Sequence, residues 1–353
     1  MFDNFDNLDL RQLNSSQLIN AIKSIPASMT TLNLFGKDLG NRTGAELAQA
    51  FASIPATVTS LNLGHNGLDS KTGDELAEAF AAIPATITSL SLSDNCLCNI
   101  KSAELAQAFA AIPATVTSLN LSQNSLNYKK GAKLKQAFGA IPTTVISLDL
   151  RHNGFDRKVD KVLPAIPASV TSLTWSLYNP GNKKCAKLLK AFAAIPATVS
   201  YLDLSHNDLG HKTGAELVQA FAAIPASVTS LNLSENGLGN ITDAELAQVL
   251  AAIPASVTSL NLSCNGLKNK TGAELVQAFA EIPATVTFLN LSRNGFYSKT
   301  GSELEEVFAA IPATVTRVNL EDNNKINQLY VNYIKSRELP PINNSNNISM
   351  RKF

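Results

Sequence analysis

The chain has 353 residues, of which 45% are hydrophobic and 16% charged, and its formal net charge is +1. It contains no run of 18 apolar residues, so we expect no transmembrane helix. The first residues, MFDNFDNLDLRQL, carry acids where a secretory signal needs positive charge and an apolar run, so we expect no such signal.

An Ile-Pro dipeptide recurs along the chain from Ile25 to Ile311, every 29 residues except between Ile141 and Ile166, which are 25 apart. A fixed period of this length predicts a stacked-repeat architecture, an α/β solenoid of about eleven turns. Residues 1–28 are an incomplete repeat and predict an N-terminal cap, because a terminal turn has no outer neighbour. In this cap, Asn14 and Gln17 have the spacing that starts a helix.

Each full turn begins with a strand, as in Val58–Leu68, which follows the pattern L-x-x-L-x-L-x-x-N-x-L. Leu61 and Leu63 are two residues apart and therefore point to one side, while Ser60 and Asn62 point to the other. Asn66 turns inward, and we expect its amide to bond to backbone groups of neighbouring turns. The same asparagine recurs in the later turns: Asn95, Asn124, Asn153, Asn207, Asn236, Asn265, Asn294 and Asn323.

A helix fills the second half of each turn. Leu76, Ala79, Phe80 and Ile83 form one apolar stripe, and Pro84 ends the helix. Threonine and glutamate three residues apart predict capping boxes. These pairs are Thr43–Glu46, Thr72–Glu75, Thr213–Glu216, Thr242–Glu245, Thr271–Glu274 and Thr300–Glu303. Because helices are wider than strands, the stack should curve, with its parallel sheet on the concave face and the helices on the convex face.

The turn at residues 154–182 is irregular. Its helical half is four residues short and contains Pro164, and the next strand has Trp175 in a core leucine position. Four residues are about one helical turn, so the apolar face can stay in register. We expect a local break in the stacking here. Residues 326–338 have the pattern of a helical C-terminal cap, so 1–338 is predicted to be a single solenoid, and 339–353 a flexible tail.

This unit, with a full helix in a 29-residue turn, resembles the ribonuclease-inhibitor-like class of leucine-rich repeat proteins over about residues 5–325. The repeat sequence, IPATVTSLNLS-x-N-x-L followed by TGAELAQAFAAIPA, resembles the repeats of the leucine-rich repeat effectors of Legionella. Those effectors are delivered into a host cell by a type IV secretion system. The resemblance implies binding to a host protein in the host cytoplasm; without it, we expect a cytoplasmic protein.

Catalytic and metal-binding interpretations have little support in the sequence. Asp203 and His206, two turns after Asp149 and His152, could form a hydrolase or transferase site with serines of the concave face. Serine occurs in nearly every turn, however, so a polar recognition surface is the better explanation. Cys96 and Cys98 lack C-x-x-C spacing and a second pair, and the cysteines form no paired cap frame, which favours a reducing compartment. We assign no catalytic, cofactor or metal residue.

Binding specificity should arise where the repeat pattern is broken, because identical turns present identical Ser and Asn side chains. Exposed aromatic and arginine residues anchor many interfaces. Two groups break the pattern on the concave side. The first is Trp175, Tyr178, Tyr201, Asp203 and His206, where Trp175 also fits the core; the second is Phe288, Arg293 and Arg317.

A third departure is a band of basic residues. Residues 129–190 contain 12 Lys or Arg and 3 Asp or Glu, while the remainder of the chain has an acidic excess. The basic band comprises Lys129, Lys130, Lys133, Lys135, Arg157, Lys158, Lys161, Lys183, Lys184, Lys187 and Lys190. It could dock an acidic protein or an anionic membrane, or be a solvated helix face. No aromatic residues interleave it, so we expect no nucleic-acid partner. The sequence therefore predicts a non-enzymatic protein-interaction module of unknown partner.

Overall fold

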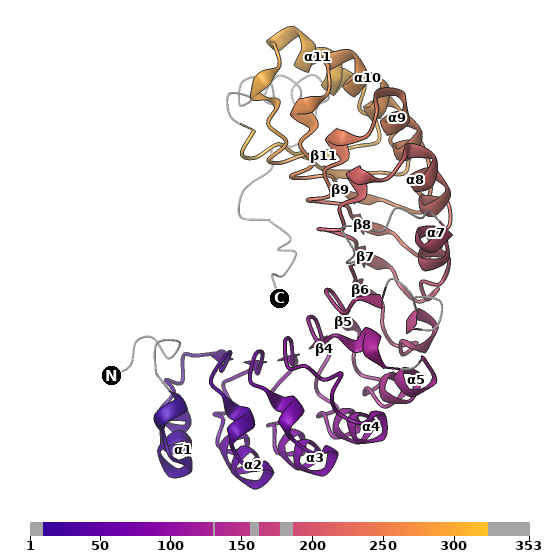
Figure 1. Ribbon diagram of the computed structural model, residues 1–353. Helices are drawn as coiled ribbons and strands as arrows, with labels where there is room; N and C mark the ends of the chain where they lie inside the picture. Colours follow the sequence, from indigo (N-terminus) through magenta and orange to yellow (C-terminus); the bar gives the residue numbers. More distant parts are fainter. Residues whose placement is uncertain (1–9, 130, 156–161, 177–185, 324–353) are drawn as a thin grey trace. The chain divides into compact units, whose positions relative to one another are not determined.

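The computed structural model describes residues 10–129, 131–155, 162–176 and 186–323 (Figure 1). The chain divides into two compact units, Met1–Tyr178 and Asn179–Phe353, and the division falls within the irregular turn. Each unit is a stack of strand–helix turns. Within each, the helices cover one face of a parallel sheet, and we call the opposite, solvent-facing side the open face (Figure 1).

The first unit contains a sheet of six short strands in sequence order. They are β1 (Thr31–Asn33), β2 (Ser60–Asn62), β3 (Ser89–Ser91), β4 (Ser118–Asn120), β5 (Ser147–Asp149) and β6 (Ser172–Thr174). Its described α-helices are α1 (Ser15–Lys23), α2 (Gly44–Ala52), α3 (Gly73–Ala81), α4 (Ser102–Ala110) and α5 (Gly131–Gly139). A short 3-10 helix, such as Leu68–Ser70, joins strand to helix in most turns.

The second unit repeats the same arrangement with five strands. They are β7 (Tyr201–Asp203), β8 (Ser230–Asn232), β9 (Ser259–Asn261), β10 (Phe288–Asn290) and β11 (Arg317–Asn319). Its described α-helices are α7 (Ala186–Ala193), α8 (Gly214–Phe221), α9 (Asp243–Ala251), α10 (Gly272–Ala280) and α11 (Gly301–Ala309).

The core is built from one set of side chains per turn. Leu61, Leu63, Leu76 and Phe80 are each at most 1% exposed, and their counterparts in the other regular turns are similarly buried. The shortened turn keeps the strands in register, since Leu148 pairs with Leu173 although they are only 25 residues apart. The expected local break in the stacking therefore does not fall between β5 and β6, whose pairing continues across the four-residue deletion.

The inward asparagines behave as predicted. The amide nitrogen of Asn95 donates to the carbonyls of Leu63, Leu92 and Ser93 at 2.9–3.1 Å. Its side chain is fully buried, and the equivalent residues from Asn66 to Asn323 are at most 7% exposed. These amides satisfy carbonyls that the strand-to-helix loop would otherwise bury without a partner.

Most of the predicted helix starts are also confirmed. The capping box forms at Asn14, Thr43, Thr72, Thr213, Thr271 and Thr300. Thr242 is the exception: its hydroxyl donates to the Glu245 carboxylate and caps no backbone N–H. The six boxes fix where these helices begin and therefore how far each lies from its strand.

Candidate functional site

The open face of each sheet is lined by the first and third residue of every strand. Ser60 and Asn62 are half-buried there, while Leu61 between them is buried against the helices. The amide oxygen of Asn62 accepts a hydrogen bond from the backbone of Gly64, two residues later, at 3.0 Å. This bond holds the asparagine side chain against the end of the strand. Most turns of both units repeat it, so the open face is a regular polar surface.

In the first unit, the open face carries an arginine–aspartate pair at β5. Arg151 donates to both carboxylate oxygens of Asp149, with its Nη2 2.6 Å and its Nε 3.1 Å from Oδ2. Asp149 is 5% exposed, and its Oδ1 also accepts from the Arg151 backbone N–H. The carboxylate is thus occupied by Arg151, which fits a structural role better than that of a base beside His152.

In the second unit, Tyr201, Asp203 and His206 lie on β7 and the loop that follows it. The Tyr201 hydroxyl is 3.5 Å from Asp203 Oδ2, and the Ser205 backbone N–H donates to Asp203 Oδ1. The ring of His206 instead approaches Glu235 of the next turn, with Nε2 and Oε1 3.3 Å apart. The geometry that would orient an imidazole on Asp203 for catalysis is therefore not the one observed.

Phe288, Arg293 and Arg317 lie at the C-terminal end of the second sheet. The Arg317 guanidinium stacks over the half-buried ring of Phe288, 5.3 Å from its centroid, while Arg317 itself is exposed. Arg293 Nε donates to Asp322 Oδ2 at 2.8 Å, and this bond raises the pKa of the guanidinium. The pair presents an exposed cation stacked on a half-buried aromatic ring on the open face, and both residue types are common interface anchors.

Trp175 is not available to a partner. It is 0% exposed and fills the core position that leucine occupies in other turns. Its place in the first predicted binding group is therefore wrong, and the alternative core assignment is confirmed. Tyr178, from the same group, lies outside the described residues. Tyr201, Asp203 and His206 remain as a cluster within the second unit.

The basic band is corrected at Lys129, which is 6% exposed and is no surface residue. Its ammonium donates to the carbonyls of Cys98 and Ile100 in the preceding turn, and burial lowers its pKa. Lys133, Lys135 and Lys190 are exposed. The other predicted members lie outside the described residues or have side chains that do: Lys130, Arg157, Lys158, Lys161, Lys183, Lys184 and Lys187.

The role of Lys129 belongs to a series that the sequence analysis missed. Arg42 donates to the carbonyl of Leu13 at 2.7 Å, Lys270 to that of Ile241, and Lys299 to that of Lys268 at 3.1 Å. Each cation satisfies a backbone carbonyl in the segment that precedes the helix one turn earlier. The signal was the 29-residue spacing of basic residues immediately before the helix N-caps.

A second missed series runs along the rim of each sheet, one residue before each inward asparagine. These rim residues have left-handed backbones although none is glycine, as at His65 (φ 54°) and Arg293 (φ 57°). In three neighbouring pairs, a basic side chain approaches a carboxylate: His65 with Asp94, His206 with Glu235, and Arg293 with Asp322. The pairs are largely exposed to solvent, which screens the interaction, so each adds little to stability.

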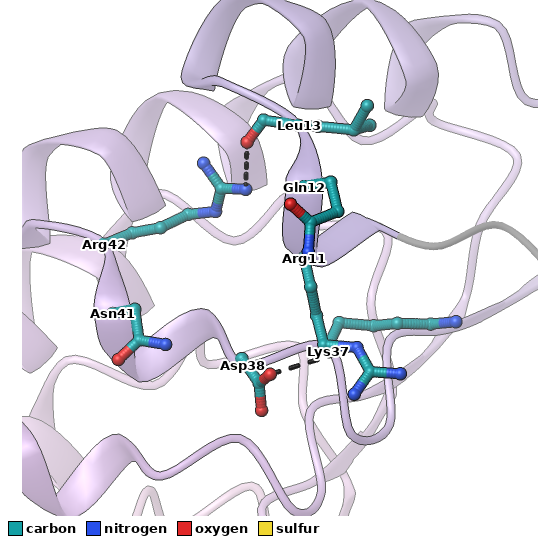
Figure 2. Close-up of a pocket in the computed structure, with 7 residues that line it drawn as sticks. All are labelled: Arg11, Gln12, Leu13, Lys37, Asp38, Asn41 and Arg42. Carbon is teal, nitrogen blue, oxygen red and sulfur yellow. Dashed lines mark hydrogen bonds and ion pairs between the residues drawn. The ribbon is translucent and has the colours of Figure 1, made fainter.

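A polar pocket of about 600 Å³ lies beside the N-terminal turn (Figure 2). Its lining combines the cations Arg11, Lys37 and Arg42 with a single acid, Asp38. Arg42 is held by the Leu13 carbonyl, and Arg11 Nε lies 3.9 Å from Asp38 Oδ2. Lys37 occupies the place that the inward asparagine takes in later turns, which is how this turn comes to present a cation.

The described cysteines are free thiols: Cys96, Cys98 and Cys264. Burial is the main cause that raises the pKa of each. A raised pKa reduces the thiolate fraction at neutral pH and with it nucleophilic reactivity. Among the described residues, no three His, Cys, Asp or Glu side chains are grouped closely enough to hold a metal ion. No helix in that same part of the chain has the length and apolar character needed to cross a membrane.

Comparisons with known proteins agree with this architecture. A family model described as "Leucine Rich repeat" matches residues 254–275. The crystal structure of the leucine-rich repeat-containing protein LegL7 from Legionella pneumophila is similar with a TM-score of 0.73 and 37% sequence identity, covering 82% of this chain and 93% of LegL7.

The yeast Rad7 and Elc1 complex is a more remote match. Its TM-score is 0.43 at 14% identity, and the match covers 78% of this chain and 73% of that one. A search of curated proteins found no match. The strand–helix period, the inward asparagines and the 37% identity to LegL7 together establish that this chain belongs to the leucine-rich repeat family.

Proposed function

We propose that this protein is a non-enzymatic binding module that recognises a protein partner through the open face of its sheet. The stacked Phe288–Arg317 pair is the observation that carries the proposal. It combines a half-buried aromatic ring with an exposed guanidinium stacked over it, on strands whose backbone is fixed by neighbours on the same sheet. Rigidly held aromatic and arginine residues lose little conformational freedom on binding and commonly dominate interface energies.

The test compares three forms of the protein in affinity capture from a eukaryotic cell lysate. One is the wild type, one carries Phe288→Ala with Arg317→Ala, and one carries Lys133→Ala with Lys135→Ala on helix α5. A partner kept by the α5 variant and lost by the open-face variant supports the proposal. Loss in the α5 variant alone would move recognition to the basic band and contradict it.

The identity to LegL7 supports a more specific role, that of a bacterial effector acting on a protein of a host cell. Delivery would then proceed through a type IV secretion system into the host cytoplasm. A fusion to a calmodulin-dependent adenylate cyclase, expressed in Legionella pneumophila, tests this directly. Host cAMP should rise with a strain whose type IV system is intact and should stay at background with a strain that lacks it; equal signals from both would refute delivery by this route.

A further inference from the structure

On the open face of strands β8–β11, asparagine side chains have their acceptor oxygens already occupied and present their NH₂ groups as hydrogen-bond donors. In each of these strands, the third residue is an asparagine: Asn232, Asn261, Asn290 and Asn319. The amide oxygen of each accepts from the backbone N–H two residues later, at 2.9–3.0 Å. The amide oxygen is therefore committed to the fold, and the NH₂ group is the end left for other partners.

These NH₂ groups have no hydrogen-bond partner within the part of the chain that the structure describes. The first unit differs, because there Asn62 donates to Asn33 across one pair of turns at 3.0 Å. Asn232 and Asn261 are each 7% exposed, so their NH₂ groups lie close against the sheet rather than at the ends of long, mobile side chains. Burying such donors against a partner without acceptors would be costly.

Among the first and third residues of strands β8–β11, which line the open face, all formal charge is positive. Of the eight first and third residues of β8–β11, Arg317 alone is charged, and the others are serine, asparagine and Phe288. The strip ends on its other side at β7, where Asp203 occupies the asparagine position and Tyr201 lies beside it. A partner carboxylate is thus attracted by Arg317 and by the asparagine donors, and repelled at β7 by Asp203 and in the loops after β8 and β11 by the exposed Glu235, Glu321 and Asp322.

We propose that β8–β11 bind an acidic, extended segment of the partner protein, with carboxylates on the asparagine NH₂ groups and on Arg317. This inference rests on the proposed function and specifies its ligand. Neighbouring strands are about 4.8 Å apart, so the four asparagines span about 14 Å, which is the length of about four extended residues. The ligand is therefore a short segment in which acidic residues are at most a few positions apart.

Replacing Asn261 and Asn290 by aspartate tests the donors without removing the bond that holds each side chain. The fold already accepts aspartate at this position: Asp149 takes the Arg151 backbone N–H at 2.9 Å, and Asp203 takes that of Ser205 at 2.8 Å. The double variant should therefore unfold at nearly the wild-type temperature. Asn240→Asp is the control for added charge: it places one negative charge, where the double variant places two, in the same unit away from the strip and keeps the bond from Asn269.

The probe is a displayed library of random twelve-residue peptides, selected on the full-length wild type. The enriched peptides should contain clustered Asp or Glu, and synthetic copies with Asn or Gln in their place should bind roughly tenfold more weakly or worse. The variant with Asn261→Asp and Asn290→Asp should weaken Kd by a similar factor, and Asn240→Asp should not. Enrichment without acidic residues, or an unchanged Kd in the double variant, overturns the inference.

The same experiment distinguishes failure of the acidic ligand from failure of the open face as the binding surface. Peptides that ignore the aspartate substitutions but are lost on Phe288→Ala with Arg317→Ala overturn only the acidic ligand and leave the open face as the binding surface. Peptides that ignore every open-face variant overturn both. Adding salt should weaken binding of an acidic ligand, which gives an independent reading of the same electrostatic contact.

Discussion

The backbone N–H of Asn95 donates to the amide oxygen of Asn124, 29 residues later and 3.0 Å away. The same oxygen accepts from the N–H of Leu97 at 3.3 Å, and the Asn124 amide nitrogen reaches back to the Leu92 carbonyl at 2.9 Å. One side chain thus joins two turns through both of its polar atoms. Because each turn of a solenoid touches only its neighbours, such links set how cooperatively the stack unfolds.

Asn124→Ala should lower the free energy of unfolding by about 3 kcal/mol or more, since it leaves several buried backbone groups without partners. The matched control is Asn120→Ala, four residues earlier on the open face, where the side chain accepts one bond from Ser122. That change should cost about 1 kcal/mol or less. Urea unfolding followed by circular dichroism measures both, and equal losses would show that the inward asparagine contributes no more than a surface one.

Lys129 should be shielded from amine-reactive reagents although it is a lysine in a basic segment. Its ammonium is buried and donates to two carbonyls of the preceding turn, whereas Lys133 and Lys135 are exposed. Labelling with an N-hydroxysuccinimide ester, read by mass spectrometry, should be roughly tenfold slower or more at Lys129, because the reagent must wait for local opening. The difference should vanish in denaturant; a rate equal to that of Lys133 in the folded protein would contradict the burial.

Glu75 should make the first unit sensitive to acid. Hydrogen bonds from the Thr72 and Gly44 backbone N–H groups lower the pKa of its carboxyl below the ordinary value of 4.5. A lowered folded-state pKa adds stability that is present above pH 4.5 and is lost as the pH falls through the folded-state value. Glu75→Gln should therefore be less stable than wild type at pH 7, with the gap narrowing below pH 4.5.

The control for this prediction is Glu78→Gln on the same helix, which is exposed and takes no part in the capping box. Thermal unfolding from pH 7 down to pH 3 should give parallel curves for the wild type and this control. A Glu75→Gln curve that also runs parallel would mean that the box carries no pH-dependent stability.

Gly210 should not tolerate a side chain. It lies in the 3-10 helix Leu209–His211, and a Cβ there would fall 1.9 Å from the carbonyl oxygen of Gly237 in the next turn. Backbone must move to make room, so Gly210→Ala should lower stability by about 2 kcal/mol. Gly301→Ala, at the start of helix α11, meets nothing within 4 Å and should leave the melting temperature unchanged or slightly higher. Differential scanning fluorimetry measures the melting temperatures of both variants, and equal values for Gly210→Ala and Gly301→Ala would contradict the prediction.

Features that depend on neighbours in sequence could be predicted well. The capping box of Thr72 and Glu75 forms as expected because its two partners are three residues apart on one helix turn. Thr242 and Glu245 have the same spacing but make a side-chain bond instead, which spacing alone does not distinguish. Trp175 was ambiguous for a related reason, because an aromatic residue in a leucine position is compatible with either core or interface.

The sequence by itself determined the period, the solenoid fold, the inward asparagines and the helix starts, because each follows from a pattern repeated at fixed spacing. Only the tertiary structure decided where individual polar side chains point. It buried Lys129 against the preceding turn, directed His206 to Glu235, and committed the amide oxygens of the open-face asparagines while leaving their donors outward. The first two of these choices are contacts between residues 29 positions apart, whereas the asparagine bond joins residues only two positions apart at the end of a strand.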